Sequence, residues 1–223
     1  MLAEALLYAR ARLGGQQNPH GHLTELVGIW SRHRRQRQAW AGHLTRSRAL
    51  CLGVAEGCGQ GRRRTALVLG AGLLLDVPLE PLSRLFRRVV LADLAFLPGV
   101  VRLAKALGNV ELLRADLSGC MDGLPGAAGL AARTPAPEPD LSLALADLDF
   151  VFSANLLSQL PLFALACLRQ RLPGHPAADL EAFAASLVRA HLAGLMPKIQ
   201  SVGWPAPKAE FLLKHFDFSG SVV

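Results

Sequence analysis

The distribution of hydrophobic residues changes near residue 65, where short apolar runs begin to alternate with amphipathic segments. Residues 65–69 form a continuous apolar run, typical of a strand buried on both faces, and residues 89–92 and 110–113 predict a second and a third strand. Between them, residues 79–88 and 100–107 carry apolar side chains at the spacing of an amphipathic helix. This order predicts a parallel α/β sheet with right-handed crossovers, whose ligand lies at the carboxyl ends of the strands.

The residues before this region predict only helices. Residues 2–13 have helix-forming composition and are followed by Gly14 and Gly15, a helix stop. Residues 23–54 place apolar side chains three, four and seven positions apart, which predicts two consecutive helices or one bent helix. We therefore divide the chain into a helical cap, residues 1–60, and an α/β domain, residues 61–223.

The residues after the third strand predict a loop at 119–141, a fourth strand at 148–153, helices at 160–171 and 180–195, and a fifth strand at 198–203. About twenty residues follow the fifth strand, fewer than a helix and two further strands need. We therefore expect a sheet of five to seven strands with an incomplete terminal hairpin. The exposed edge of that sheet favours self-association into a homo-oligomer.

The composition is that of a globular protein with a packed core. Of the 223 residues, 51% are hydrophobic and 18% are charged, which excludes disorder over most of the length. No apolar run reaches the roughly 18 to 20 residues of a membrane-spanning helix, and the first residues lack the pattern of a secretory signal. We expect a cytoplasmic protein without membrane contact. The four cysteines have no metal-ligand spacing, which predicts free thiols and no metal.

The positive charge is concentrated in one segment. The net charge is +7, and residues 31–48 contain six arginines and no acid. Three interpretations of this segment are open. It is a solvated helix face, or it is a nucleic-acid surface with Trp30 and Trp40 as stacking platforms. In the third, it is a lid in which Trp40, His43 and Arg46 face an anionic substrate. In the first reading, Trp40 is buried against the sheet domain and most of the arginines are exposed.

A turn containing Gly70 and Gly72 follows the first strand directly. A dinucleotide-binding turn would have its third glycine at position 75, where this chain has leucine. Asp76 would repel a pyrophosphate and attract an ammonium group, although it is also placed to cap the helix that follows. The sign of the charge favours a cationic ligand over NAD.

Residues 65–160 resemble the class I S-adenosylmethionine-dependent methyltransferases, including bacterial members without an assigned substrate. The resemblance is carried by VLGAG at 68–72, by RADLSG at 114–119, by DLDFVFSANLLSQLP at 147–161, and by an aspartate 21 positions after Gly72. It implies a Rossmann-like fold, S-adenosylmethionine as cofactor, a ribose-binding role for Asp93 and an adenine contact for Asp116. The cofactor-binding residues that it implies are Gly70, Gly72, Asp76, Asp93, Asp116, Ser153 and Asn155.

The chain departs from the family's pattern at two places. Leu74 stands where the first motif has its third glycine, and Ser158 and Gln159 stand where the small-molecule subgroup has two histidines. We expect a methyltransferase for a small or anionic substrate, without an assigned base because methyl transfer requires mainly alignment. The expected substrate contacts are Trp40, His43, Arg46, Ser158 and Gln159. The alternative is a non-catalytic methyltransferase-like module that binds a ligand or, through residues 31–48, nucleic acid.

Overall fold

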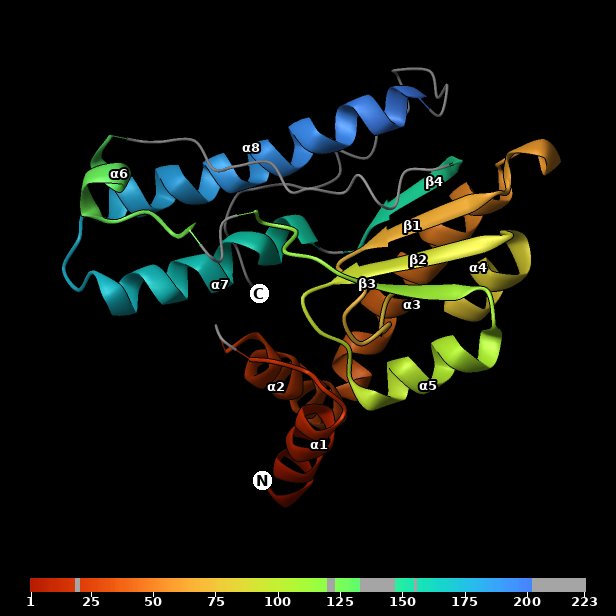
Figure 1. Cartoon of the computed structure of the whole chain (residues 1–223), viewed down its shortest axis with the longest axis horizontal. Coiled ribbons are helices and arrows are strands. Elements are labelled where there is room, and N and C mark those ends of the chain that lie inside the picture. Colours follow the sequence, from red (N-terminus) through yellow and green to blue (C-terminus); the bar gives the residue numbers. More distant parts are fainter. Residues whose placement is uncertain (19–20, 120–122, 133–146, 155, 202–223) are drawn as a thin grey trace.

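The centre of the protein is a parallel sheet of four strands. The computed structural model describes residues 1–18, 21–119, 123–132, 147–154 and 156–201. The strands are β1 (Thr65–Leu69), β2 (Arg88–Asp93), β3 (Val110–Arg114) and β4 (Leu148–Ser153), and they lie in the order β3-β2-β1-β4 (Figure 1). All three pairings are parallel. The predicted parallel α/β, Rossmann-like architecture is therefore confirmed.

Helices cover both faces of this sheet because β1 and β2 are apolar on both sides. Leu67 and Leu69 of β1 pack with α6 (Ala127–Ala131), α7 (Leu156–Arg171) and α8 (Ala177–Ser201). Ala66 and Val68 pack with α3 (Arg37–Glu56), α4 (Leu79–Leu85) and α5 (Pro98–Leu107). These four strand side chains have no exposed surface, so β1 is the centre of a three-layer structure.

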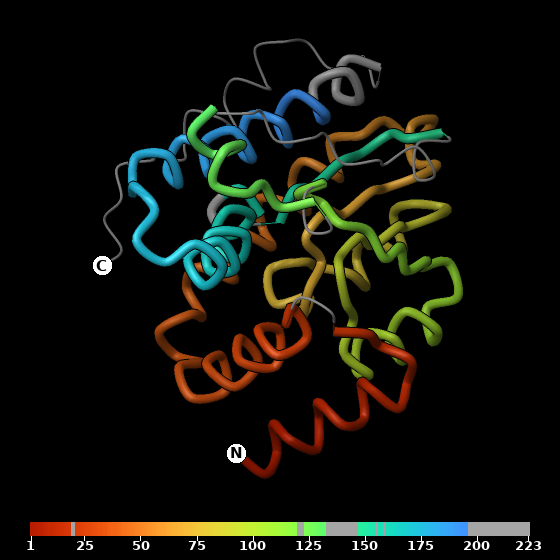
Figure 2. The backbone as a smooth tube through the Cα atoms, turned by 60° about the vertical axis from the view of Figure 1, so that its left-hand side comes forward, coloured from red at the N-terminus to blue at the C-terminus, as the bar shows by residue number. Residues whose placement is uncertain are grey.

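The first two helices, α1 (Leu2–Leu13) and α2 (His22–Arg35), form a smaller cluster of their own. Ala11, Leu23 and Val27 pack there against Ala95 and Leu97, which belong to the connection between β2 and α5. Figure 2 shows both helices at the end of the molecule opposite α8. The two amino-terminal helices therefore rest on the loop that follows β2.

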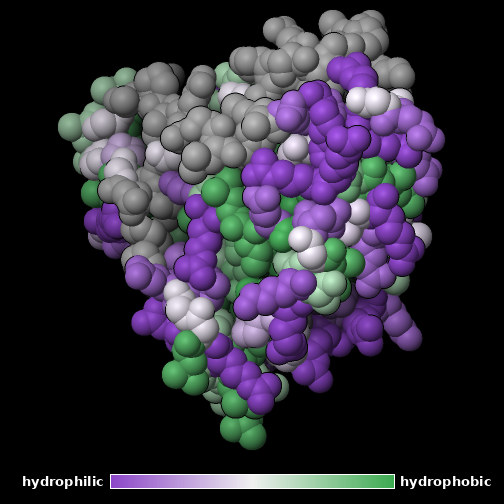
Figure 3. Space-filling view, turned by 45° about the vertical axis from the view of Figure 1, so that its right-hand side comes forward, coloured by the Kyte–Doolittle hydropathy of each residue, from purple (hydrophilic) through white to green (hydrophobic). Residues whose placement is uncertain are grey.

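The outer side of α1 is apolar. Met1, Leu2, Leu6 and Leu13 are exposed there. Figure 3 shows hydrophobic side chains at the lower tip of the molecule, where α1 lies, and hydrophilic side chains over much of the rest of that face. Among the described helices, none has both the length and the apolar composition that a membrane span requires.

Several predicted boundaries differ from the structure. The helix predicted at 79–88 ends at Leu85, because Arg88 already pairs in β2. The helix predicted from residue 160 begins at Leu156, and residues 127–131 of the predicted loop form α6. Residues 23–54 form two helices, α2 and α3, which confirms one of the two predicted arrangements.

The fifth strand predicted at 198–203 is wrong over residues 198–201. These residues continue α8, since the segment offers only Ile199 and Val202 as β-branched residues and the preceding helix extends through it. The described residues thus contain four strands and not five to seven. The predicted incomplete hairpin lies at 204–223, outside the described residues, and self-association through that edge stays a prediction.

An ion pair joins β4 to the chain that enters β1. Asp149 of β4 is 2% exposed, and its carboxylate accepts hydrogen bonds from Arg64 N at 2.8 Å, Nε at 3.0 Å and Nη2 at 2.7 Å. These hydrogen bonds lower the pKa of Asp149 below its ordinary value. Because the two residues are 85 positions apart, this contact fixes the pairing of distant strands.

Replacing Asp149 should therefore destabilise the fold. Asp149→Ala leaves the Arg64 N–H without its acceptor, and we expect the free energy of unfolding in urea to fall by about 2 to 4 kcal/mol. The control is Asp147→Asn, because Asp147 binds the same guanidinium but its side chain is 66% exposed, and asparagine tolerates its left-handed φ of 55°. Its denaturation midpoint should stay close to that of the wild type, and equal losses in the two variants would contradict the assigned role.

Candidate functional site

The candidate site lies where the chain leaves β1, at the point where the order of the sheet reverses. β1 lies between β2 and β4, and the chain continues from β1 toward α4 on one face and from β4 toward α7 on the other. Parallel α/β sheets bind ligands at the carboxyl ends of their strands at such a point. The loops from Gly70, Asp93 and Ser153 all begin at this edge.

The turn after β1 has a left-handed backbone at every second residue. The φ angles are 73° at Gly70, 44° at Gly72 and 60° at Leu74. This conformation is rare for a residue with a side chain and costs about 1 kcal/mol or more. Leu74 therefore adopts a backbone conformation that favours glycine, while its side chain is buried in the cluster with residues of α3 and α4.

Gly70 is required by close approach as well as by conformation. A Cβ atom at this position would lie 3.1 Å from the carbonyl oxygen of Ala154 and 3.1 Å from Cδ1 of Leu156. The connection between β4 and α7 thus passes directly over the start of the turn. A side chain at residue 70 would push these two connections apart.

Asp93, at the end of β2, holds the glycine turn in place. Its Oδ2 accepts a hydrogen bond from Gly72 N at 2.7 Å, and its Oδ1 accepts one from Leu94 N at 2.7 Å. Burial raises the pKa of Asp93 to about 6, since the loss of hydration outweighs the hydrogen bonds from the backbone amides. The N–H group of Ala95 is a third backbone partner of this carboxylate. The two oxygens together can accept about four hydrogen bonds, so the carboxylate has capacity for a ligand as well.

Asp76 does not cap α4, and that prediction is wrong. The helix begins at Leu79 after Pro78, without a side-chain hydrogen bond at its cap, because Val77 and Pro78 separate Asp76 from the first turn. The charge of Asp76, after burial, contributes to raising the pKa of the Cys51 thiol in α3 to about 12. Asp76 is half-buried and stands between the glycine turn and α4 in the sequence. Because α4 begins only at Leu79, its amino end does not directly follow the glycines.

Asp116 shapes the turn that follows β3. Its Oδ1 accepts hydrogen bonds from Ser118 N at 2.9 Å and from Ser118 Oγ at 2.5 Å. The Asp116 carbonyl also accepts a hydrogen bond from Gly119 N at 3.2 Å. Asp116 therefore stabilises a turn through its own side chain. Its contact with adenine stays a prediction.

Ser153, at the end of β4, has a side-chain partner that the sequence analysis missed. Ser153 Oγ lies 3.2 Å from Nε2 of His191, a residue of α8 that is 1% exposed. His191 stands four residues from Leu187 and from Leu195, both buried, and this helical spacing was the signal that could have revealed it. Asn155 and the side chain of Ser158 lie outside the described residues, and Gln159 is exposed on α7.

The three substrate residues predicted on α3 are spaced three apart, so Trp40 and His43, and His43 and Arg46, are neighbours on the helix surface. At about 100° per residue, Trp40 and Arg46 lie about 120° apart around the helix axis, and their contact with a substrate stays a prediction. Trp40 is half-buried, with its ring centroid 5.7 Å from that of His33, whereas His43 and Arg46 are exposed. The expectation of a Trp40 buried against the sheet domain is wrong, because Leu44 is the buried residue of this part of α3.

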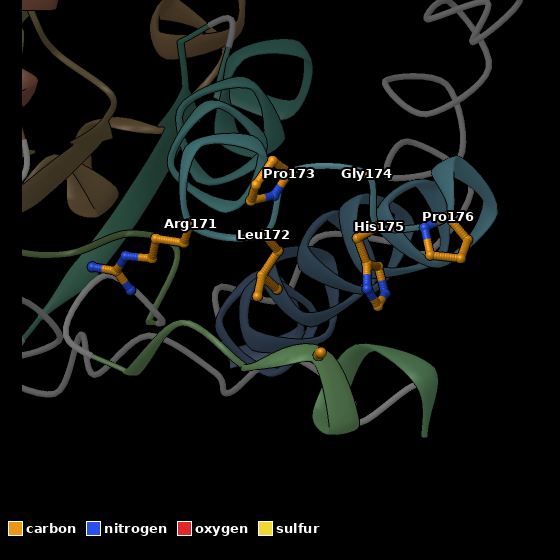
Figure 4. Close-up of a pocket in the computed structure, with 7 residues that line it drawn as sticks. Arg171, Leu172, Pro173, Gly174, His175 and Pro176 are labelled. Atoms are coloured by element: carbon orange, nitrogen blue, oxygen red, sulfur yellow. The ribbon is translucent and has the colours of Figure 1, made fainter.

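The described part of the chain has no cluster of metal ligands. Cys51, Cys58 and Cys167 are free thiols. A hollow of about 390 Å³ lies at the turn between α7 and α8, lined by Ala127 and residues 171–176. Figure 4 shows Leu172 and His175 pointing toward α6 and Arg171 pointing away from them. The hollow is at the opposite end of the 16-residue α7 from the glycine turn.

No protein-family model, curated protein or solved structure matches this chain. Any functional assignment consequently depends on the geometry of the glycine turn, Asp93 and the strand order.

The close approach at Gly70 can be separated from its backbone conformation. Gly70→Ala adds both a strained φ and a clash with Ala154 and Leu156, whereas Gly108→Ala adds strain at a φ of 77° with no atom within 4 Å. We expect Gly108→Ala to lower the free energy of unfolding by about 1 kcal/mol and Gly70→Ala to lower it by about 1 to 3 kcal/mol more. Equal losses would show that the turn has room for a side chain.

The raised pKa of Asp93 predicts how stability depends on pH. Between its ordinary value of 3.8 and about 6, the folded protein holds the proton that the unfolded chain releases. The stability of the wild type relative to Asp93→Asn should thus fall by about 2 to 3 kcal/mol as the pH rises from 4 to 6. Above that window the difference should be constant. Urea denaturation of both proteins across this pH range measures the difference in their free energies of unfolding. A difference that does not change with pH would contradict the raised pKa of Asp93.

Proposed function

We propose that the protein binds S-adenosylmethionine at the glycine turn and is a methyltransferase for a small or anionic substrate. The observation that carries this proposal is the carboxylate of Asp93 at the end of β2, anchored by the N–H groups of Gly72 and Leu94. The backbone N–H of Ala95 also hydrogen-bonds this carboxylate. A carboxylate at the end of this strand is placed to accept hydrogen bonds from the hydroxyl groups of a ribose.

The charges around the turn support a cation over a diphosphate. Asp76 and Asp93 both border the glycine turn, and Asp116 follows the next strand along the sheet. A diphosphate is normally held by the amino end of a helix, but six residues separate Gly72 from α4, which has only seven residues. Carboxylates attract the ammonium and sulfonium groups of S-adenosylmethionine and repel phosphates.

The roles of the protein's own residues follow from this arrangement. Gly70 lets the backbone of the turn pass close under the β4–α7 connection, Asp93 would accept the ribose hydroxyls, and Asp116 would lie on the adenine side. S-adenosylmethionine supplies a methyl group activated by its positive sulfur, so the protein's contribution is chiefly to align the acceptor. The competing function is a binding module that holds the same ligand without transferring the methyl group.

Calorimetric titration tests the ligand. At pH 7.5 we expect S-adenosylmethionine and S-adenosylhomocysteine to bind and NAD not to bind. Asp93→Ala should weaken binding by about 1 to 3 kcal/mol, because it removes a charged hydrogen-bond acceptor. Asp179→Ala, in the first turn of α8, is the control and should bind as the wild type does. Binding of NAD alone would refute the proposal.

The same titration at several pH values tests the role of Asp93 directly. With a pKa of about 6, Asp93 is mostly protonated at pH 5 and ionised at pH 7.5. Affinity should therefore rise about tenfold over this range in the wild type and stay flat in Asp93→Asn. Binding without transfer of a labelled methyl group to small-molecule acceptors would favour the binding module.

A further inference from the structure

The arginines of residues 31–48 fall into separate groups. All six are exposed. Arg32 pairs with Glu25 at 2.8 Å, and Arg35 donates a hydrogen bond to Ser31 at 2.6 Å and lies 3.6 Å from Glu4. These two have acidic neighbours, so they are partly neutralised by the protein itself.

Arg37 and Arg48 form no ion pair with any acid in the described part of the chain. They are 11 positions apart on α3, so they lie within about 20° of each other around the helix and about 16 Å apart along it. Both charges, after burial, contribute to lowering the pKa of His33. The two guanidinium groups therefore lie on the side of α3 that faces His33 of α2.

Aromatic rings lie beside these charges. The guanidinium carbon of Arg34 is 4.7 Å from the centroid of the Trp30 ring, and Trp40 lies against His33. Both tryptophans keep part of their surface exposed. Arg46 does not belong to this group, because it lies about 180° from Arg37 around α3 and approaches Gly42.

We propose that Arg34, Arg37 and Arg48, with Trp30 and Trp40, form a surface that binds single-stranded nucleic acid through its phosphates and bases. Guanidinium groups bind phosphate in a bidentate manner. The exposed parts of the two indole rings offer stacking surface to unpaired bases, which an acidic peptide would not use. The surface acts independently of any ligand at the glycine turn, so it does not rest on the function proposed above.

Fluorescence anisotropy with a labelled 12-nucleotide single-stranded RNA, and with the matching DNA, tests this surface. Three phosphate contacts predict that affinity falls about 20-fold between 50 and 200 mM salt. The double variant Arg37→Gln/Arg48→Gln keeps one contact, so its affinity should fall only about threefold over the same range. At 50 mM salt it should bind at least about fivefold more weakly than the wild type.

The control is Arg46→Gln/Arg102→Gln, which removes the same charge from exposed sites on another face of α3 and on α5. It should keep the affinity and salt dependence of the wild type to within about twofold. Asp93→Asn should also bind RNA normally, which separates this test from that of the glycine turn. The proposal is overturned by absence of binding at 50 mM salt, by an equal loss in the control, or by equally tight binding of a polyglutamate peptide of the same charge.

Discussion

The arrangement at the carboxyl edge of the sheet depends on the buried carboxylate of Asp93. Its two oxygens accept hydrogen bonds from backbone N–H groups on different connections, Gly72 after β1 and Leu94 after β2. A neutral side chain would hold these amides less strongly, because hydrogen bonds to a charged acceptor are the stronger kind. The carboxylate loses hydration when it joins the loops after β1 and β2, and this loss raises its pKa.

The amino-terminal helices are attached to the same point. Gln16 is 5% exposed, and its Oε1 accepts a hydrogen bond from Phe96 N at 3.3 Å, two residues after the amide that Asp93 holds. Leu26 of α2 lies on the other side, where a Cβ atom at Gly72 would be 3.8 Å from its Cδ1. The loop after β2 and the glycine turn thus both lie against the amino-terminal helices.

The sequence predicted well those elements whose pattern is local. Residues 148–153 form β4 with the predicted bounds, and Asp93 ends β2 as its place after an apolar run indicated. The left-handed backbone of Leu74 was not predicted, because the identity of a residue does not reveal its backbone angles. The contact of His191 with Ser153 joins residues that are distant in the chain, and the packing of Trp40 depends on His33 of a neighbouring helix. The end of α8 depends on packing that no local pattern specifies.

The pairing of β1 with β4 has a consequence for synthesis of the chain. Arg64 and Asp149 are separated by 85 positions, and the strands between them pair only on the other side of β1. At about 5 to 20 residues per second, a ribosome needs about 4 to 17 seconds to cover that distance. During this interval one edge of the most apolar strand has no native neighbour, so nascent chains at this stage are the species that a chaperone would need to protect from aggregation.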